Sequence, residues 1–394
     1  MRVVQVTHMY PKLPGDRYGI TMQDQIRALA ESCGVESSVI APTPWVPHIL
    51  HSVPRWKGIA HCPSHATLRG IEVSYPKYLT APRGFLRQMG RRAFCTAAAS
   101  AFRQTSSRKK VDLVHAHMAI PDGLAAFKIS RLYSCPFVVT IQATDLDLTA
   151  QAGGAHAIQL AQIFAAAAAV MSPSPRLTRA FAAQFGYPIV TVPYGIHLDD
   201  PHGDAGDTRA ELPPGKILLT VARLLRSKGI DDLIRACSRL VNNRLEFHLV
   251  IVGDGPDRGR LETIVRSTGL TEHVSFLGAL PHREVLRYMA ACDVFVLPSW
   301  RETFGLVYLE AMAAGKPVIG VREQGIDGII EEGKTGFLVA PRSIHELAGA
   351  LWQLLSDSDL AHTTGANARS LVLDTLTWQR TAERTMEIYE QAIP

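Results

Sequence analysis

The stretch CDVFVLPSWRETFGLVYLEAMAAG, Cys292 to Gly315, contains a strand, a tight loop and a helix in succession. Its first part, Cys292–Ser299, is an apolar run followed by turn residues, which is typical of a buried parallel strand. The run from Leu306 consists of good helix formers and closes at Gly315. Open α/β sheets bind ligands at the carboxyl ends of their strands, where a helix N-terminus presents free N–H groups. We therefore expect a phosphate at this loop.

Apolar strand-like runs and helical stretches alternate over nearly the whole chain of 394 residues, of which 47% are hydrophobic. Such alternation predicts α/β domains with right-handed, mostly parallel sheets. It breaks at residues 197–215, which are rich in Asp, Gly and Pro, and we interpret this range as a linker. The sequence therefore predicts two Rossmann-like domains that face each other across a cleft, residues 1–196 and 216–375, with a last helix at 376–394.

The N-terminus and the cysteines give expectations about the compartment. The first residues contain only a short apolar run, and no stretch approaches the length of a membrane span. The six cysteines are scattered without CxxC spacing, which favours reduced packing residues over disulfides or a zinc site. We therefore expect a soluble, cytoplasmic protein.

Basic and glycine residues follow two further strands of the second domain. Arg223 and Lys228 lie in VARLLRSKG, and Gly253 and Gly255 lie in IVGDGP after the next strand. A guanidinium, an ammonium and a helix N-terminus at one sheet edge would bind a diphosphate, and glycines would let the backbone approach it closely. The alternative for the two cations is a solvated loop. Neither a P-loop nor a GxGxxG fingerprint occurs, which argues against an ordinary NTPase or dinucleotide enzyme.

Glu302 and Glu310 are expected on either side of this diphosphate. If the helix begins near Leu306, Glu310 lies one turn inside it, about 10 Å from Glu302 at 1.5 Å per helical residue. One carboxylate can accept both hydroxyls of a ribose, and the other can accept hydroxyls beyond the second phosphate. A nucleotide sugar has ribose, diphosphate and polyol in this order. A solvent-facing Glu310 is the alternative, and its apolar neighbours Val307 and Leu309 argue against it.

Together these segments resemble one family. ETFGLVYLEAMAAGKPVIG resembles the E-x7-E signature of the group 1 family of retaining glycosyltransferases, also called glycosyltransferase family four, which have the GT-B fold and include enzymes of bacterial cell-envelope polysaccharide synthesis. VARLLRSKG resembles the family's diphosphate loop, and VHAHMAIPDGLAA resembles its first-domain histidine motif. TWQRTAERTMEIYEQAI resembles its closing helix, which crosses back onto the first domain. The resemblance covers essentially the whole chain.

The resemblance implies a role for each matching residue. Glu310 would hold the ribose, and Arg223 and Lys228 would hold the diphosphate. Glu302 would hold the transferred sugar, together with the backbone of Phe304, Gly305 and Leu306. His117 would reach the distal hydroxyls of the sugar from across the cleft. The catalytic residues would therefore be Glu302, His117, Arg223 and Lys228.

Several positions depart from the family pattern. Relatives often have His-Gly-Ser-Asp after the strand that here reads PFVVTIQATD, so Gln142 replaces a histidine and Asp145 is retained in the cleft. In QGIDGII, Gly328 replaces a glutamate. The early loop THMYPKLPGDRYGIT has single glycines, Gly15 and Gly19, where many relatives have a Gly-Gly pair beside the diphosphate. The changes at Gln142 and Gly328 lie on the sugar side of the expected cleft. Sugar transfer is therefore still expected, but the identity of the donor sugar stays open.

The expected reaction uses no metal ion or other cofactor. Cleavage at the anomeric carbon develops negative charge on the leaving diphosphate, which fixed cations stabilise. A retaining glycosidase would need two carboxylates about 5 Å apart, and the spacing of Glu302 and Glu310 argues against this. We therefore expect same-face transfer from a UDP or GDP sugar to an acceptor hydroxyl, whose proton passes to the departing phosphate. A hydrolysing epimerase of the same fold and a non-enzymatic nucleotide-sugar-binding protein are the alternatives.

Two groups of histidines are candidate metal ligands. His115 and His117 are expected to point to opposite faces of their strand, which would prevent them from sharing a metal ion. His115 is expected to be a core residue. The segment HCPSH, residues 61–65, lacks further ligands nearby, so we expect no metal site.

A basic segment lies in the first domain. Residues 77–110 contain nine Lys and Arg but no acidic residue, and an apolar side at near-helical spacing comes from Phe85, Leu86, Met89, Phe94 and Phe102. A basic amphipathic helix at residues 83–110 predicts docking to an anionic membrane, such as the inner face of the plasma membrane, or to an acidic or lipid-linked acceptor. Nucleic acid is not expected, because no reader motif occurs. The alternative is a core-packed helix with a solvated basic face. The base, sugar, acceptor, linkage and oligomeric state stay open.

Overall fold

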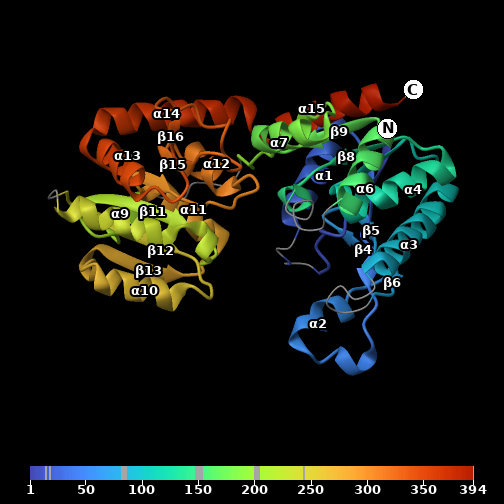
Figure 1. The fold of residues 1–394 in the computed structure, drawn as a ribbon, viewed down its shortest axis with the longest axis horizontal. Coiled ribbons are helices and arrows are strands. Elements are labelled where there is room, and N and C mark those ends of the chain that lie inside the picture. The colour runs from blue at the N-terminus through green and yellow to red at the C-terminus, as the bar shows by residue number, and fades with distance from the viewer. Residues whose placement is uncertain are drawn as a thin grey trace. The chain divides into compact units, whose positions relative to one another are not determined.

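The structure is a computed structural model that describes residues 1–13, 16, 19–80, 87–146, 154–198, 205–242 and 245–393. The chain forms two compact units (Figure 1). Unit 1 comprises Met1–Pro173, Leu177–Tyr194 and Trp378–Pro394, and unit 2 comprises Ser174–Arg176 and Gly195–Thr377. Each unit has helices packed on a parallel or mostly parallel sheet, so the predicted α/β class is confirmed. Among the described helices, none is both long and apolar enough to cross a membrane.

Unit 1 contains an eight-stranded sheet with the order β10-β9-β8-β7-β1-β2-β5-β4. Its strands are β1 (Arg2–Val6), β2 (Glu36–Ile40), β4 (His65–Leu68), β5 (Ile71–Ser74), β7 (Leu113–Ala116), β8 (Phe137–Thr140), β9 (Ala169–Ser172) and β10 (Val190–Thr191). All neighbours are parallel except β4, which is antiparallel to β5. A separate parallel pair consists of β3 (Thr43–Pro44) and β6 (Lys77–Tyr78). The central strands are apolar because helices cover both faces of the sheet.

The helices of unit 1 form two layers. On one face, α1 (Ile20–Cys33) packs against α15 (Trp378–Ala392), so the end of the chain belongs to unit 1. On the other face, Figure 1 shows α3, α4 and α6 beside the strands, and with α7 they enclose the core around Phe94, Phe102 and Phe164. The bounds are α3 (Arg87–Arg108), α4 (Leu124–Tyr133), α6 (Gly154–Ala166) and α7 (Pro175–Phe185), with α2 (Pro54–Ala60), η1 (His48–Leu50) and η3 (Ala119–Gly123) in the connections.

Unit 2 contains a six-stranded, wholly parallel sheet with the order β13-β12-β11-β14-β15-β16. Its strands are β11 (Lys216–Val221), β12 (Phe247–Val252), β13 (Val274–Gly278), β14 (Val294–Val296), β15 (Val318–Val321) and β16 (Gly336–Val339). Its helices and turns are α8 (Ala205–Ala210), η4 (Arg226–Lys228), α9 (Ile230–Asn242), α10 (Arg258–Ser267), η5 (Thr271–His273), α11 (His282–Ala291), α12 (Leu306–Ala313), α13 (Ile344–Ser356) and α14 (Ser358–Thr375). The chain runs from β11 outward through β12 to β13 and then returns to the other side of β11 at β14. Ligands of open α/β sheets bind at such a switch point.

The predicted linker differs from the structure. The units divide between Tyr194 and Gly195, and the described second half of residues 197–215 contains α8, which packs against α11 within unit 2. Arg209 of α8 holds this position, because its guanidinium contacts Asp293 Oδ2 at 3.1 Å and donates to the Gly215 carbonyl. The segment rich in Asp, Gly and Pro therefore contains a short polar helix in addition to the connection between the two units. The chain leaves unit 2 after Thr377. This boundary lies close to the start of the last segment that the sequence predicted, residue 376.

The predicted basic helix corresponds to α3, and residues 83–86 lie outside the described residues. Phe94 and Phe102 are buried in the core of unit 1, so the apolar side of α3 packs inside its own domain. Met89 was predicted on this apolar side, but its side chain is 62% exposed. The reason is the helical period, since five residues turn by about 500° and place Met89 and Phe94 about 140° apart. The described part of α3 therefore favours a core-packed helix with an exposed basic face.

Candidate functional site

Two neighbouring strands of unit 2 bring the predicted donor residues together. β11 and β14 are parallel and adjacent, so their carboxyl ends meet at one edge of the sheet. The loop after β11 carries Arg223 and Lys228, and the loop after β14 carries Glu302 and ends at α12. The predicted adjacency of these loops is confirmed.

The loops after β11 and β14 touch through their backbones. Gly229 has φ 66°, and a Cβ atom built on it would lie 2.1 Å from the Pro298 carbonyl oxygen, so no side chain fits there. The Trp300 N–H donates to the Ser227 carbonyl at 3.0 Å. Beside this contact, Lys228 Nζ donates to Glu302 Oε2 at 2.6 Å, with 19% and 16% of the two side chains exposed. The ammonium and the carboxylate are therefore held together by the loops that bear them.

Arg223 lies on the open side of the same loop. Its side chain is exposed, and no ion pair of its guanidinium occurs within the described ranges. The backbone on either side is fixed, because Ala222 donates to Val252 and Leu224 donates to Asp254, both at 3.0 Å. The guanidinium can therefore turn towards an anion while its Cα position stays constant.

Gly253 and Gly255 pack closely against the neighbouring loop of the protein. The glycines were expected to let the backbone approach a ligand. In the structure, a Cβ on Gly253 would lie 1.9 Å from the Ala222 carbonyl oxygen, and one on Gly255 would lie 2.4 Å from that of Leu224. The close approach is between two loops of the protein, and it fixes the segment that carries Arg223.

The N-terminus of α12 is formed by Gly305 and Leu306. Gly305 has φ 86° and is the N-cap, and no side chain caps the helix. A Cβ on Gly305 would lie 2.6 Å from the ring of Tyr308, whose hydroxyl donates to the Leu297 carbonyl. Phe304 is buried beside this turn, with 2% of its surface exposed. The first N–H groups of α12 are thus available for an anion, as the sequence predicted.

The loop that contains Gly328 supports Glu302 from the other side. Gln324 Oε1 accepts the Glu302 N–H at 3.1 Å, and a Cβ on Gly325 would lie 2.4 Å from the backbone of Thr303. Gly328 has φ 90°, which favours glycine. Sequence analysis missed Gln324, and the nearby glycines were the signal for a close backbone approach.

Glu310 projects from α12 towards α11. Its Oε1 lies 3.0 Å from His282 Nε2, and 21% of its side chain is exposed. The carboxylate is therefore partly buried, in agreement with the argument against a solvent-facing position. His282 was not predicted, because the spatial proximity of the two residues depends on the packing of α11 against α12.

In unit 1, Gly19 and His117 lie at the carboxyl edge of the sheet, and His115 lies within β7. Gly19 has φ 80° and caps α1, and a Cβ there would lie 2.2 Å from the Met9 carbonyl oxygen. Gly15 lies outside the described residues. His115 and His117 were expected on opposite faces, which is wrong: their rings stack with centroids 4.1 Å apart. Residues two apart in a strand share a face, because side chains alternate with a period of two.

Both histidines are buried and neutral. His115 is a core residue, as predicted, with ring nitrogens 2.7 Å from the Tyr389 hydroxyl and 2.8 Å from the Thr140 hydroxyl. His117 Nε2 lies 2.8 Å from Gln5 Oε1, so Nε2 carries the proton and Nδ1 is an acceptor. Nδ1 is buried and has no hydrogen-bond partner in the part of the chain that the structure describes. Burial lowers the pKa of His117 to about 3.

Asp145 organises the loops after β7 and β8. Its carboxylate accepts the N–H groups of Ala119, Ile120 and Gln142 at 2.9 to 3.2 Å. Burial raises the pKa of Asp145 to about 6, and the three N–H donors act against this rise. Gln142 Nε2 donates to the Tyr194 hydroxyl at 2.6 Å and to the His117 carbonyl at 3.3 Å. Gln142 therefore links the loop of His117 to Tyr194, the last residue of the middle segment of unit 1.

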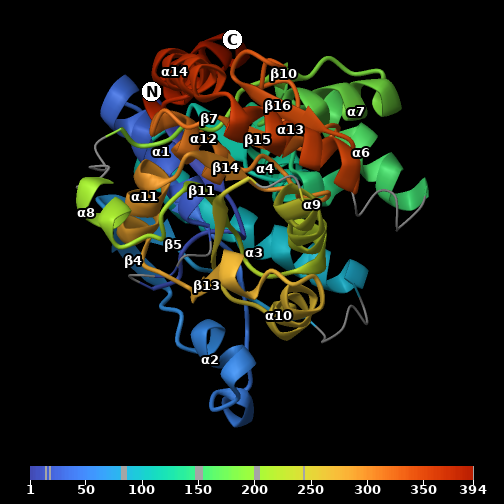
Figure 2. The ribbon, with the colours of Figure 1, turned by 90° about the vertical axis from the view of Figure 1, so that its left-hand side faces the viewer.

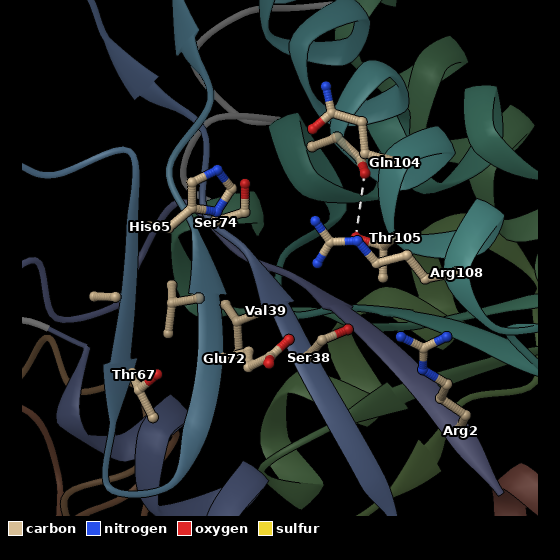
Figure 3. Close-up of a pocket in the computed structure, with 13 residues that line it drawn as sticks. Arg2, Ser38, Val39, His65, Thr67, Glu72, Ser74, Gln104, Thr105 and Arg108 are labelled. Carbon is tan, nitrogen blue, oxygen red and sulfur yellow. Dashed lines mark hydrogen bonds between the residues drawn. The ribbon is translucent and has the colours of Figure 1, made fainter.

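Two further features bear on other kinds of site. Within the described ranges, no three or more His, Cys, Asp or Glu side chains are placed to hold a metal ion. A groove of about 420 Å³ lies between α3 and strands β2, β5 and β4, with Glu72, Gln104 and Arg108 on its walls (Figure 3). None of the predicted site residues lines this groove, so it is separate from the candidate donor site.

Comparison with known proteins identifies the family. The family model "Glycosyl transferases group 1" matches residues 208–371, and "Glycosyl transferase 4-like domain" matches residues 18–195. A glycogen synthase of Mycobacterium tuberculosis is 31% identical over 291 residues, which are 71% of this chain and 68% of that protein. The chain belongs to the group 1 glycosyltransferases.

Two further similarities extend over nearly the full chain. TuaC of Bacillus subtilis (strain 168), whose name assigns it provisionally to teichuronic acid biosynthesis as a glycosyltransferase, is 26% identical over 400 residues, with 94% of this chain and 97% of TuaC covered. The structure of Anabaena HepE in complex with UDP-glucose matches with a TM-score of 0.69 and 20% identity, covering 99% of each chain. The fold of this glycosyltransferase is therefore GT-B, as predicted.

Proposed function

We propose that this glycosyltransferase is a retaining enzyme that moves a sugar from a nucleoside-diphosphate sugar to an acceptor hydroxyl in polysaccharide or glycoconjugate synthesis. One observation supports the donor class above the others. Lys228, Glu302 and the uncapped N-terminus of α12 come together at the switch point of the unit 2 sheet. A cation and free N–H groups favour a diphosphate, and a carboxylate beside them favours sugar hydroxyls.

The cations act on the leaving group. As the anomeric bond breaks, charge grows on the diphosphate, and Arg223, Lys228 and the α12 N-terminus stabilise it without moving far. Lys228 has three N–H donors, so it can keep its bond to Glu302 and still donate to a phosphate oxygen. Because these groups supply positive charge at the leaving oxygen, the proposed mechanism includes no metal ion or cofactor.

Glu310 is proposed to hold the ribose. A carboxylate can accept both ribose hydroxyls, and its partial burial strengthens such bonds. His282 touches the same carboxylate and orients it. Since the ribose does not change during transfer, this interaction contributes to binding rather than to the chemical step.

His117 is proposed to accept a hydrogen bond from a distal hydroxyl of the sugar. The unpartnered Nδ1 atom supports this role, because Gln5 fixes the proton on the opposite nitrogen. Asp145 and Gln142 position the loop of His117 through its backbone. Retention follows if the acceptor attacks from the side of the departing phosphate, which then takes its proton.

A ligand screen followed by product analysis tests the proposal. A nucleotide sugar at 100 times its Kd should stabilise the protein by about 2.7 kcal/mol in thermal unfolding. The best donor is then incubated with an acceptor library, and the anomeric configuration of the product is read by NMR. Inversion would overturn the retaining mechanism. If the sugar of the donor changes its configuration in the absence of an acceptor, the protein is an epimerase, and if free sugar is released, it is a hydrolase. Binding of the donor without any turnover would favour a non-enzymatic binding protein.

A further inference from the structure

A lobe of unit 1 projects away from the rest of its fold. Residues 43–62 contain β3, η1 and α2, and Figures 1 and 2 both show α2 extending beyond the body of unit 1. The lobe is attached at its base. β3 pairs with β6, and Lys77 Nζ donates to the Cys62 carbonyl at 3.0 Å.

Large apolar side chains are exposed on this lobe and beside it. Ile49 is 85% exposed, Leu79 69%, Met89 62% and Trp45 51%, and Val53 at the start of α2 is also exposed. We call these five residues the apolar tip. Single exposed apolar residues are normal on soluble proteins, but a contiguous group of them marks an interaction surface.

Backbone contacts bring three members of the apolar tip together, namely Trp45, Leu79 and Met89. The Trp45 N–H donates to the Tyr78 carbonyl at 2.8 Å, so Trp45 and Leu79 occupy neighbouring positions of the β3 and β6 pair. A Cβ on Gly90 would lie 2.7 Å from Thr80 Oγ1, so the start of α3 lies against the residue after Leu79. Met89 therefore belongs to the same end of unit 1 as Trp45 and Leu79.

The sequence around the apolar tip is strongly basic. Residues 37–111 contain twelve Lys and Arg and a single acidic residue, Glu72. Lys57 on α2, Lys77 on β6 and Arg92 on α3 are exposed, so cations border the tip on three elements. An apolar group with cations beside it is complementary to a layer that has an apolar interior and anionic groups at its surface.

The rest of α3 is occupied by its own domain. The Arg91 guanidinium donates to Gln159 Oε1 at 2.9 Å and lies 3.3 Å from His156 Nδ1, so it is held against α6. The buried Phe94 and Phe102 leave no apolar stripe for lipid along this helix. A membrane contact that runs the length of α3, as the sequence predicted, is therefore less favourable than one at the apolar tip.

We infer that the apolar tip inserts into the interface of an anionic lipid bilayer, while Lys57, Lys77 and Arg92 contact its headgroups. Trp prefers the boundary between headgroups and acyl chains, and a projecting lobe can reach this boundary without burying the body of the domain. The exposed cations add an attraction to anionic lipid that salt screens. Docking of this kind does not depend on the reaction proposed above, but it would place the glycosyltransferase where a lipid-linked acceptor lies.

Vesicle flotation tests the inference on the full chain. Vesicles of phosphatidylcholine with rising phosphatidylglycerol content should bind the protein with rising affinity, and salt should weaken the binding. Ile49→Asp and Leu79→Asp should each weaken it by about tenfold, because a charge at the membrane interface opposes insertion. Leu132→Asp on α4 is the matched control, since Leu132 is 59% exposed and lies outside the tip, and it should bind as the wild type does.

Three outcomes would overturn the inference. They are absent vesicle binding by the wild type, binding that does not depend on phosphatidylglycerol, and equal binding by Ile49→Asp and Leu132→Asp. A wild-type dimer that Ile49→Asp makes monomeric, without vesicle binding, would assign the tip to self-association instead. The assay contains neither donor nor acceptor, so its result is separate from the result of the transfer assay. Circular dichroism of each variant confirms that the exposed substitutions leave the fold intact.

Discussion

Lys228 donates to Glu302 at 2.6 Å across the loops that follow two adjacent strands, with both side chains mostly buried. Removing one partner leaves the other charge without its counterion in a partly desolvated site. The pair is therefore a single electrostatic unit of the proposed donor site. Mutations at its two positions should not have additive effects, because residues in direct contact are coupled.

Lys228→Ala should slow the transfer step at saturating donor. Loss of the ammonium leaves charge on the departing phosphate uncompensated, which should cost about 2 to 4 kcal/mol, or roughly 30-fold to 1000-fold in kcat. Arg223→Ala should have an effect of the same order. Lys334→Ala, an exposed lysine of unit 2, is the control and should keep wild-type kcat. Near-normal kcat in both Lys228→Ala and Arg223→Ala would place the diphosphate elsewhere.

Glu310→Ala should weaken donor binding and leave kcat at saturating donor nearly unchanged. The proposed bonds to ribose are equal in the ground and transition states, so their loss raises KM alone. His282→Ala should have a smaller effect in the same direction, because His282 acts on the ribose through the Glu310 carboxylate that it contacts. Glu284→Ala, on the exposed face of α11, is the control. A fall in kcat with unchanged KM in Glu310→Ala would contradict the ribose role.

Gly253→Ala should destabilise the protein and impair donor binding together. Gly253 has φ 129°, and the added Cβ would lie 1.9 Å from the Ala222 carbonyl oxygen, so the loop that carries Arg223 must shift. We expect a loss of more than about 1 kcal/mol in stability, from the strained backbone. Gly259→Ala in α10 meets nothing within 4 Å and should be neutral or stabilising, since Ala favours helices. Equal melting temperatures for the two variants would contradict this account.

The parts of the fold that sequence analysis identified are those with strong periodicity. The inner strands of the unit 2 sheet are buried apolar runs, so their positions could be predicted, and the edge strand β13 is mainly apolar but only partly buried. The hairpin of β4 and β5 was missed, because its strands are short and half polar. Its turn places Arg69 and Gly70 at φ 48° and 81°, and Gly70 was the only turn signal between the two strands.

The site residues that could be predicted are those that belong to a sequence motif. Lys228 and Glu302 could be brought together because adjacent parallel strands end at one edge of the sheet. His282, Gln324 and Gln5 belong to no motif, and their contacts depend on how α11, the 322–328 loop and β1 pack in three dimensions. The orientation of His115 and His117 was predictable from strand geometry, and the error came from assigning the wrong period.

His117→Gln should reduce the sensitivity of the fold to acid. The pKa of His117 falls from an ordinary value of 6.5 to about 3 on folding, so the unfolded chain binds a proton that the folded protein does not bind between these values. Stability is therefore lost as the pH falls below 6.5, and at pH 5 this residue alone should account for about 2 kcal/mol. Asp145, with its pKa raised to about 6, acts in the opposite direction but is present in both proteins, so it cancels in the comparison. Urea unfolding at pH 7 and pH 5 should show a smaller loss of stability for His117→Gln than for the wild type, while His345→Gln, at an exposed position, should behave as the wild type does. The same loss in all three proteins would mean that His117 can take up a proton in the folded state, and its proposed role as a neutral acceptor would then be wrong.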